Sequence, residues 1–351
     1  MNTVLSHLPG RTTEINGAEH LFFSGYSYLG LGAVKAFTDK VKEGIDRYGV
    51  VYPSSRISNT PLDLYGSMEE ALARFTHTNA AAVFSSGFLS ARTSVETAGQ
   101  YMNVYCREST HPASSHLAGV RKVPINQSWD SFLAERRAAG EFQFAWAADS
   151  INPTYGLIHD FRYLATTPPE FSLLFIVDDS HGIGWLGTNG GGIAADLELP
   201  PHVTLLLNFS LSKSFHVNGG AVCGNSLWIG RVKQHVNFAS STPFMPALAY
   251  AWLHSETILE QQRLRLLQNI NSLQKLTTNF TFVKNEGTPV FLVELAGIAP
   301  YLLQNHVLIS SFSYPHPENI PENRIVVNAL HEPHDLEKLA LLLRSYETET
   351  A

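Results

Sequence analysis

Short apolar runs and stretches with helical spacing alternate through the middle of the chain. Helical stretches separate most of the apolar runs, as a mostly parallel sheet with covering helices requires. The predicted strands cover 80–84, 103–106, 144–148, 173–177, 205–209 and 220–224, and a helix is predicted over 90–98. This pattern predicts an α/β fold.

The two ends of the chain differ from this central part. Residues 1–32 form a predicted arm with a short hairpin. Helical spacing occurs at 34–48 and 67–75, and again at 245–279, where one long helix is predicted to bridge two domains. A strand, a helix, a strand and a final helix follow over 289–295, 299–304, 325–329 and 334–346. We therefore expect an N-terminal arm (1–35), a large domain (36–245), and an interdomain helix with a small C-terminal domain (246–351).

Composition places the chain among ordinary folded proteins. Its 351 residues suit one large and one small unit, and 44% of them are hydrophobic. No stretch reaches the roughly 18 uncharged apolar residues of a membrane span, and the first residues lack the features of a secretory signal. The net charge of −7 argues against nucleic acid as the main partner. We expect a cytoplasmic enzyme or binding protein.

The two cysteines do not define a site. Cys106 and Cys223 are far apart in the sequence and outside any CxxC spacing. This argues against a disulfide framework and against a structural zinc site.

The most informative residues follow two of the predicted strands. The apolar run 172–177 is followed by Asp178 and His181, at the strand end where open α/β sheets bind ligands. A second apolar run, 203–209, is followed by Lys213 among small hydroxyl residues. A pyridoxal phosphate (PLP) enzyme needs this set, because a lysine forms the Schiff base and an acid keeps the pyridine nitrogen protonated. A lone lysine is usually a solvated surface residue, but the two clusters in this order favour a PLP site.

Several segments match a known family. They are Tyr28-Leu29-Gly30-Leu31, Ser85-Ser86-Gly87-Phe88, Val177-Asp178-Asp179-Ser180-His181-Gly182, Gly187-Thr188-Asn189-Gly190-Gly191-Gly192 and Ser210-Leu211-Ser212-Lys213. On these residues the chain resembles the α-oxoamine synthases, which include 8-amino-7-oxononanoate synthase and 2-amino-3-ketobutyrate coenzyme A ligase. The resemblance implies fold type I of the PLP-dependent transferases, the aspartate-aminotransferase fold. That fold has a mostly parallel central sheet in a large domain and a smaller α/β C-terminal domain.

The resemblance also implies roles around the cofactor ring. Lys213 would form the Schiff base and move a proton at the substrate α-carbon, which requires burial and a neighbouring cation to lower its pKa. Asp178 would pair with the pyridine nitrogen, although the same acid could simply cap a strand end. His181 would lie near the phenolic oxygen, and His111 would stack on the ring. Asp179 would have a structural role.

Other residues would bind the cofactor phosphate and the substrate. Gly87 and Phe88 lie where the first sheet strand meets its helix, so their backbone amides would hold the phosphate, although a simple tight turn is the alternative. Ser210 would add a hydroxyl contact to the same phosphate. Arg324 would clamp the substrate carboxylate with its planar guanidinium, and a surface arginine is the competing interpretation.

Ser241 and Thr242 resemble a pair that, in this family, reaches the cofactor phosphate of the neighbouring subunit. The resemblance therefore implies a homodimer with shared active sites.

Five positions depart from the family pattern. They are Ser27, Pro153, Tyr155, Ser212 and Ser214, and the C-terminal domain is also shorter than is usual. These changes fall on the side of the substrate and acyl donor, whereas the residues around the cofactor are kept.

A nicotinamide-binding site and a metal site are two alternatives to a PLP site. Residues 182–187 fit the GxGxxG pattern of a nicotinamide-binding Rossmann protein. However, Asp178 and His181 come between strand and glycines, and the glycine-rich stretch 188–195 is poor helix-forming material. A metal site is not expected, because no second set of closely spaced histidines joins Asp178, Asp179 and His181.

The sequence thus predicts a PLP-dependent transferase. The expected reaction condenses an amino acid with an acyl thioester of coenzyme A or a carrier protein, releasing thiol and commonly carbon dioxide. A fold type I aminotransferase is the alternative, because it uses the same residues around the cofactor. A catalytically silent relative is disfavoured by intact Lys213, Asp178 and His181. We expect neither nucleic acid nor a membrane as a partner.

Overall fold

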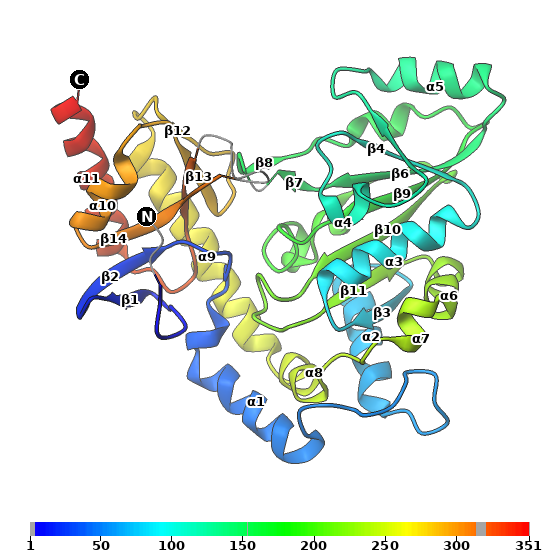
Figure 1. Cartoon of the computed structure of the whole chain (residues 1–351), viewed down its shortest axis with the longest axis horizontal. Helices are drawn as coiled ribbons and strands as arrows, with labels where there is room; N and C mark the ends of the chain where they lie inside the picture. Colours follow the sequence, from blue (N-terminus) through cyan, green and yellow to red (C-terminus); the bar gives the residue numbers. More distant parts are fainter. Residues whose placement is uncertain (1–3, 153, 314–320, 351) are drawn as a thin grey trace.

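A seven-stranded sheet forms the centre of the larger part of the molecule in the computed structural model, which describes residues 4–152, 154–313 and 321–350 (Figure 1). In spatial order its strands are β3 (Ala80–Phe84), β11 (Gly220–Gly224), β10 (Val203–Ser210), β9 (Ser172–Asp178), β6 (Gln143–Asp149), β4 (Asn103–Arg107) and β5 (Val120–Val123). Strand β11 is antiparallel to both neighbours, and the other adjacent pairs are parallel. All six strands predicted for this region are present.

Helices cover both faces of this sheet. Phe144 and Trp146 face one apolar cluster, whereas Ala145 and Ala147 face the other, because successive side chains of a strand point to opposite faces. The first face carries α2 (Asp63–Phe75), α5 (Trp129–Ala138) and α8 (Pro246–Leu253), and the second carries α3 (Gly87–Gly99), α6 (Ser226–Gln234) and α7 (Val236–Ser240). Burial on both faces explains why the strands are continuous apolar runs in the sequence.

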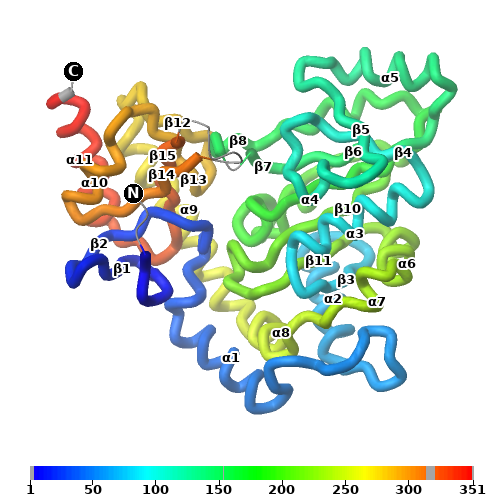
Figure 2. The backbone as a smooth tube through the Cα atoms, in the orientation of Figure 1, coloured from blue at the N-terminus to red at the C-terminus, as the bar shows by residue number. Residues whose placement is uncertain are grey.

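A six-stranded sheet forms the smaller part of the molecule. Its order is β1 (Thr12–Ile15), β2 (Ala18–Phe23), β14 (Val307–Phe312), β15 (Glu322–Val326), β13 (Val290–Val293) and β12 (Val283–Lys284). The helices α9 (Glu256–Thr277), α10 (Ile298–Gln304) and α11 (Pro333–Thr350) accompany it (Figure 2). The predicted N-terminal hairpin is present, and its strand β2 runs parallel to β14. The N-terminal arm and the C-terminal residues therefore share one sheet.

The prediction of one continuous helix over 245–279 is wrong. The chain forms α8 and α9, which are separated at His254 and Ser255. Helix α8 packs against α1 (Lys35–Tyr48), where Gly44 lies directly against the backbone of Ala247. Helix α9 then leads towards the smaller sheet (Figure 1). Because α8 packs in the larger part of the molecule and α9 leads to the smaller part, the chain turns between the two helices. The strand predicted over 325–329 also lies earlier, as β15.

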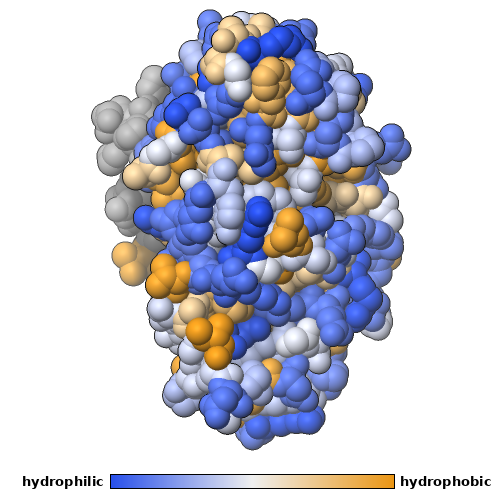
Figure 3. Space-filling view, turned by 90° about the vertical axis from the view of Figure 1, so that its right-hand side faces the viewer, coloured by the Kyte–Doolittle hydropathy of each residue, from blue (hydrophilic) through white to orange (hydrophobic). Residues whose placement is uncertain are grey.

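The remaining elements are short. They are α4 (Pro112–Ser115), the hairpin of β7 (Ile151–Asn152) and β8 (Leu157–Ile158), and the 3-10 helices η1 (Leu31–Ala33), η2 (Arg162–Thr166), η3 (Thr188–Gly190) and η4 (Ile193–Asp196). Within the described residues, no helix has both the length and the apolar character needed to span a bilayer. Hydrophobic groups on the face shown in Figure 3 are scattered among hydrophilic ones.

Candidate active site

Lys213 lies in the loop after β10, at the same sheet edge as the end of β9. A cavity of about 150 Å³ opens there. It is lined by Gly87, Phe88, His111, Ala113, Asp149, Ile151, Asp178, Ser180, His181, Ser210 and Lys213. Seven of the residues predicted from the sequence are among them: Gly87, Phe88, His111, Asp178, His181, Ser210 and Lys213.

The pKa of Lys213 is lowered mainly by burial. The carboxylates of Asp178 and Asp149 act in the opposite direction. Burial is therefore the dominant cause, rather than the neighbouring cation expected from the sequence. A lysine in this environment reaches its neutral, nucleophilic form at a lower pH than a solvated lysine does.

Asp149 is a site residue that the sequence analysis missed. It ends β6, and in the sheet register it lies beside Asp178 at the end of β9. Burial, together with the neighbouring Asp178 carboxylate, raises the pKa of Asp149 to about 8. Its Oδ2 accepts the backbone N–H of His111 at 2.9 Å, whereas its buried Oδ1 has no hydrogen-bond partner among the described residues. The signal that could have revealed it was a third acid at the end of a neighbouring strand.

The environments of the two predicted histidines favour the neutral imidazole. Burial lowers the pKa of His111 and lowers that of His181 well below its usual range. The Nδ1 of His181 shares a 2.8 Å hydrogen bond with the hydroxyl of Tyr28, whose pKa burial raises. Tyr26 packs edge-on against His181, with 4.9 Å between the ring centroids. Both imidazoles are thus positioned as neutral donors or acceptors at neutral pH.

The start of α3 lies directly against the end of β10. A Cβ added to Gly87 would lie 2.4 Å from the Cβ of Ser210, so a side chain at this position would push the two elements apart. Ser86 caps the helix by accepting the N–H of Leu89 at 3.2 Å. The first N–H groups of a helix lack intrahelical partners and form an anion site. Gly87 and Phe88, at the start of α3, line the same cavity as Lys213.

Asp179 holds the glycine-rich loop that follows β9. It is fully buried, and it accepts hydrogen bonds from the hydroxyl of Ser150 and, at 2.8 Å, from the N–H of Ile193. A side chain at Gly182 or Gly192 would collide with its carboxylate. Burial raises the pKa of Asp179 to about 7. These contacts fit the structural role expected for this acid.

Three predicted residues lie outside this cavity. Arg324 is 1% exposed, which excludes the surface interpretation, and its Nη1 donates to the hydroxyl of Tyr26 at 3.2 Å. Among the described residues, its buried Nε and Nη2 have no hydrogen-bond partner. Ser241 and Thr242 line a separate hollow of about 290 Å³, whose other wall includes Tyr52 and Ser55.

Three of the five departures from the family pattern can be described by their surroundings. Ser214 is buried and donates to the carbonyl of Ile183 at 2.6 Å, and Ser212 shares a 2.6 Å hydrogen bond with Ser210. Tyr155 is 45% exposed. Pro153 lies outside the described residues.

The nicotinamide alternative does not fit the local structure. The GxGxxG segment 182–187 is followed by the short 3-10 helices η3 and η4, and no α-helix begins within 188–202, all of which the structure describes. The helix whose N-terminus should hold a pyrophosphate is therefore missing from this described segment.

The fold is that of the fold type I transferases. No protein-family model matches the chain. It is 27% identical to 8-amino-7-oxononanoate synthase from Lysinibacillus sphaericus, covering 93% of this chain and 89% of that protein. A similar match, also 27% identical, is the enzyme of that name from Acidithiobacillus ferrooxidans, covering 93% and 88%.

Solved structures show the same fold. Serine palmitoyltransferase from Sphingomonas wittichii superposes with a TM-score of 0.86 at 19% identity, covering 99% of this chain and 92% of that one. The 8-amino-7-oxononanoate synthase from Francisella tularensis gives a TM-score of 0.72 at 22% identity, covering 95% and 99%. The predicted fold is confirmed, and so is the resemblance to the PLP-dependent α-oxoamine synthases.

Proposed function

We propose that this protein is a PLP-dependent acyltransferase that condenses an amino acid with an acyl thioester. The observation that carries the proposal is the cavity in which Lys213, Asp178 and His111 lie together. The relatives at 27% identity are named as synthases, which favours condensation over transamination. Bound PLP would supply an electron-poor ring that stabilises negative charge at the α-carbon of the amino acid.

The residues of the cavity fit this cofactor. Gly87 leaves the start of α3 open beside Ser210, which suits a phosphate held by helix N–H groups and a hydroxyl. Lys213 would bind the cofactor covalently, and Asp178 would hold a proton on its ring nitrogen. The flat imidazole of His111 would lie against the ring.

Two groups would handle the amino acid. With its lowered pKa, Lys213 would take a proton from the α-carbon and return one to it. Arg324 would bind the carboxylate, because its buried guanidinium has Nε and Nη2 unpaired among the described residues. Tyr26 would orient this guanidinium through its hydroxyl.

The active unit would be a homodimer. Ser241 and Thr242 line a hollow that contains none of the residues around Lys213. Such a position suits hydroxyl groups that complete the phosphate site of a second subunit. The coenzyme-binding residues would then come from both chains.

The cofactor assignment can be tested by chemical trapping. The protein would be incubated with PLP, reduced with borohydride and digested, and the peptides weighed by mass spectrometry. We expect PLP on the peptide that contains Lys213 and none in the Lys213→Ala variant. Lys338→Ala, which changes an exposed lysine of α11, is the matched control and should label normally. Labelling of Lys213→Ala equal to wild type would contradict the assignment.

The reaction can be tested with panels of amino acids and acyl thioesters. Thioesters of coenzyme A and of an acyl carrier protein would be assayed in parallel for thiol and carbon dioxide release. We expect thiol release that requires both substrates. Keto-acid formation without thiol release would instead identify an aminotransferase.

A further inference from the structure

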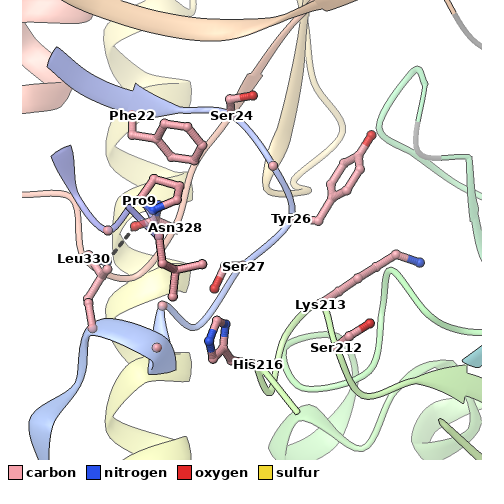
Figure 4. A pocket seen from close by; sticks show the side chains of 16 residues that line it. Pro9, Phe22, Ser24, Tyr26, Ser27, Ser212, Lys213, His216, Asn328 and Leu330 are labelled. Carbon is pink, nitrogen blue, oxygen red and sulfur yellow. Dashed lines mark hydrogen bonds between the residues drawn. The ribbon is translucent and has the colours of Figure 1, made fainter. Parts of the chain in front are cut away.

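A second cavity adjoins the one proposed for the cofactor. Its volume is about 340 Å³, and Lys213 lines both cavities. In Figure 4, Lys213, Ser212 and His216 lie on one side of it, and Phe22 and Leu330 lie on the other. A group bound there would therefore extend away from the reacting centre, towards the smaller sheet.

Part of the lining of this cavity is apolar. It includes the side chains of Leu8, Pro9, Phe22, Ala33 and Leu330. Gly30 has no room for a side chain, since an added Cβ would lie 2.4 Å from Cγ of Leu330. The backbone at Gly30 thus packs closely against that leucine.

Several polar groups of the lining already have partners within the protein. The hydroxyl of Ser24 shares a 2.7 Å hydrogen bond with Ser310, and Oδ1 of Asn328 accepts the N–H of Leu330 at 2.9 Å. Ser212 is likewise paired with Ser210. The hydroxyls of Ser24 and Ser212 and the Oδ1 of Asn328 therefore have hydrogen-bond partners without a bound ligand.

The described lining also lacks a cation that could bind a carboxylate in this cavity, apart from the amino-acid carboxylate proposed to bind Arg324. Lys213 and His216 are the basic side chains among its described residues, and Lys213 has its proposed role at the cofactor. Burial lowers the pKa of His216, which keeps that imidazole neutral at neutral pH. The nearby Arg11 is paired with Asp335 at 2.7 Å. A carboxylate buried in this cavity would lose its water without gaining a countercharge.

We propose that this cavity takes the acyl chain of the thioester, and that the accepted chain is apolar with an uncharged end. The inference rests on the proposed function and names its substrate class. The acyl carbonyl would lie at the Lys213 end, and the tail would lie between Phe22 and Leu330. Burial of the tail would favour binding of fatty acyl chains.

The substrate class can be tested with two thioesters of equal chain length. One would carry a saturated fatty acyl group, and the other an acyl group that ends in a carboxylate. We expect kcat/KM to favour the fatty acyl group by on the order of 100-fold or more, because the charged end would be desolvated unpaired. Equal or better turnover of the carboxylated chain would overturn the inference while leaving the proposed function intact. Absence of thiol release with either chain and with an acetyl thioester would count against both.

Variants can locate the chain in this cavity. Leu330→Ala should raise KM for the fatty acyl thioester several-fold more than it raises KM for the acetyl thioester. Leu341→Ala makes the same change at an exposed position of α11 and should alter neither. An unchanged KM in a folded Leu330→Ala protein would place the chain elsewhere.

Introducing a cation into this cavity provides a second, independent test. Ala33→Arg would add a guanidinium at the exposed edge of the cavity, and should shift the preference towards the carboxylated chain by roughly 10-fold. Ala138→Arg adds the same charge at an exposed position of α5, outside the cavity, and should not shift it. Equal shifts in both variants would contradict the proposed location.

Discussion

At the residue scale, Asp149 neighbours two residues of the proposed cofactor site, His111 and Asp178. Its Oδ2 fixes the backbone of His111, and its carboxyl group lies beside Asp178 in the sheet register. Two adjacent carboxylates in a buried site do not both ionise readily. Since burial and the neighbouring carboxylate raise the pKa of Asp149 to about 8, Asp149 keeps its proton at neutral pH.

The proton held by Asp149 leads to a prediction for the stability of the Asp149→Asn variant. The folded protein holds a proton on Asp149 up to about pH 8, whereas the unfolded chain loses it near the ordinary value of 3.8. Wild-type stability should therefore fall as pH rises through this window, and the amide variant lacks this effect. The free energy of unfolding of wild type, relative to the variant, should decline by about 1 kcal/mol per pH unit.

Urea unfolding of cofactor-free protein at roughly pH 5, 6.5 and 8 would measure this difference. The Asn side chain can still accept the N–H of His111, so the local fold should persist. A difference that stays constant across the three pH values would show that Asp149 is ionised throughout.

Gly87 gives a second prediction at the residue scale. Gly87→Ala would force the start of α3 away from Ser210, because the new Cβ has only 2.4 Å to the Cβ of that serine. We expect PLP affinity to fall at least 10-fold and the free energy of unfolding to fall by about 1–3 kcal/mol. Gly99→Ala at the other end of α3 is the matched control, since its nearest neighbour lies at 4.0 Å. PLP titration followed by absorbance would compare the two, and equal affinities would argue against the phosphate site.

At the element scale, the buried strands of the large sheet were predictable from the sequence. Strands such as β3 and β9 are covered on both faces, so nearly every residue must be apolar and the run itself marks the strand. The residues of chemical interest, Asp178 and Lys213, were found because they come at or soon after the ends of such runs. Their meeting in one cavity follows from the parallel pairing of β9 and β10.

Other elements could not be found by local pattern. Strand β14 and its parallel pairing with β2 join residues almost 300 positions apart, and no local signal encodes that partner. The break between α8 and α9 depends on which surface each helix packs against, whereas the apolar spacing continues through it. Asp149 escaped notice for the same reason, because its significance comes from β6 lying next to β9.

Helix packing at α1 supplies a prediction at this scale. Gly44→Ala would place a Cβ 2.5 Å from the carbonyl oxygen of Ala247, where α1 crosses α8. We expect the free energy of unfolding to fall by about 1–3 kcal/mol, because the backbone cannot yield as a side chain can. Gly66→Ala, in an exposed and open position of α2, should instead stabilise by about 0.5–1 kcal/mol. Urea unfolding of both variants checks the contrast, and equal effects would refute the close contact.

At the scale of the whole molecule, the proposed site lies where the two sheets come together. Lys213 and Asp178 come from the large sheet, whereas Tyr26 and Arg324 belong to the segment after β2 and to β15. Strand β2 pairs with β14, so the N-terminal residues are held beside the C-terminal ones. A substrate bridging Lys213 and Arg324 would therefore contact both parts of the molecule.

In the proposed dimer, the partner chain also contributes residues to each active site. Mixing two inactive variants tests this proposal. Lys213→Ala removes the cofactor lysine, and a Ser241→Glu, Thr242→Glu double variant places charge where a phosphate should bind. If sites are shared, a heterodimer has one intact site, made from Lys213 of one chain and Ser241 and Thr242 of the other. Random reassociation would then restore about a quarter of wild-type activity, because half the dimers are mixed and each has one good site. If each site is built from a single chain, every site in the mixture carries a defect, and activity stays at the level of the separate variants.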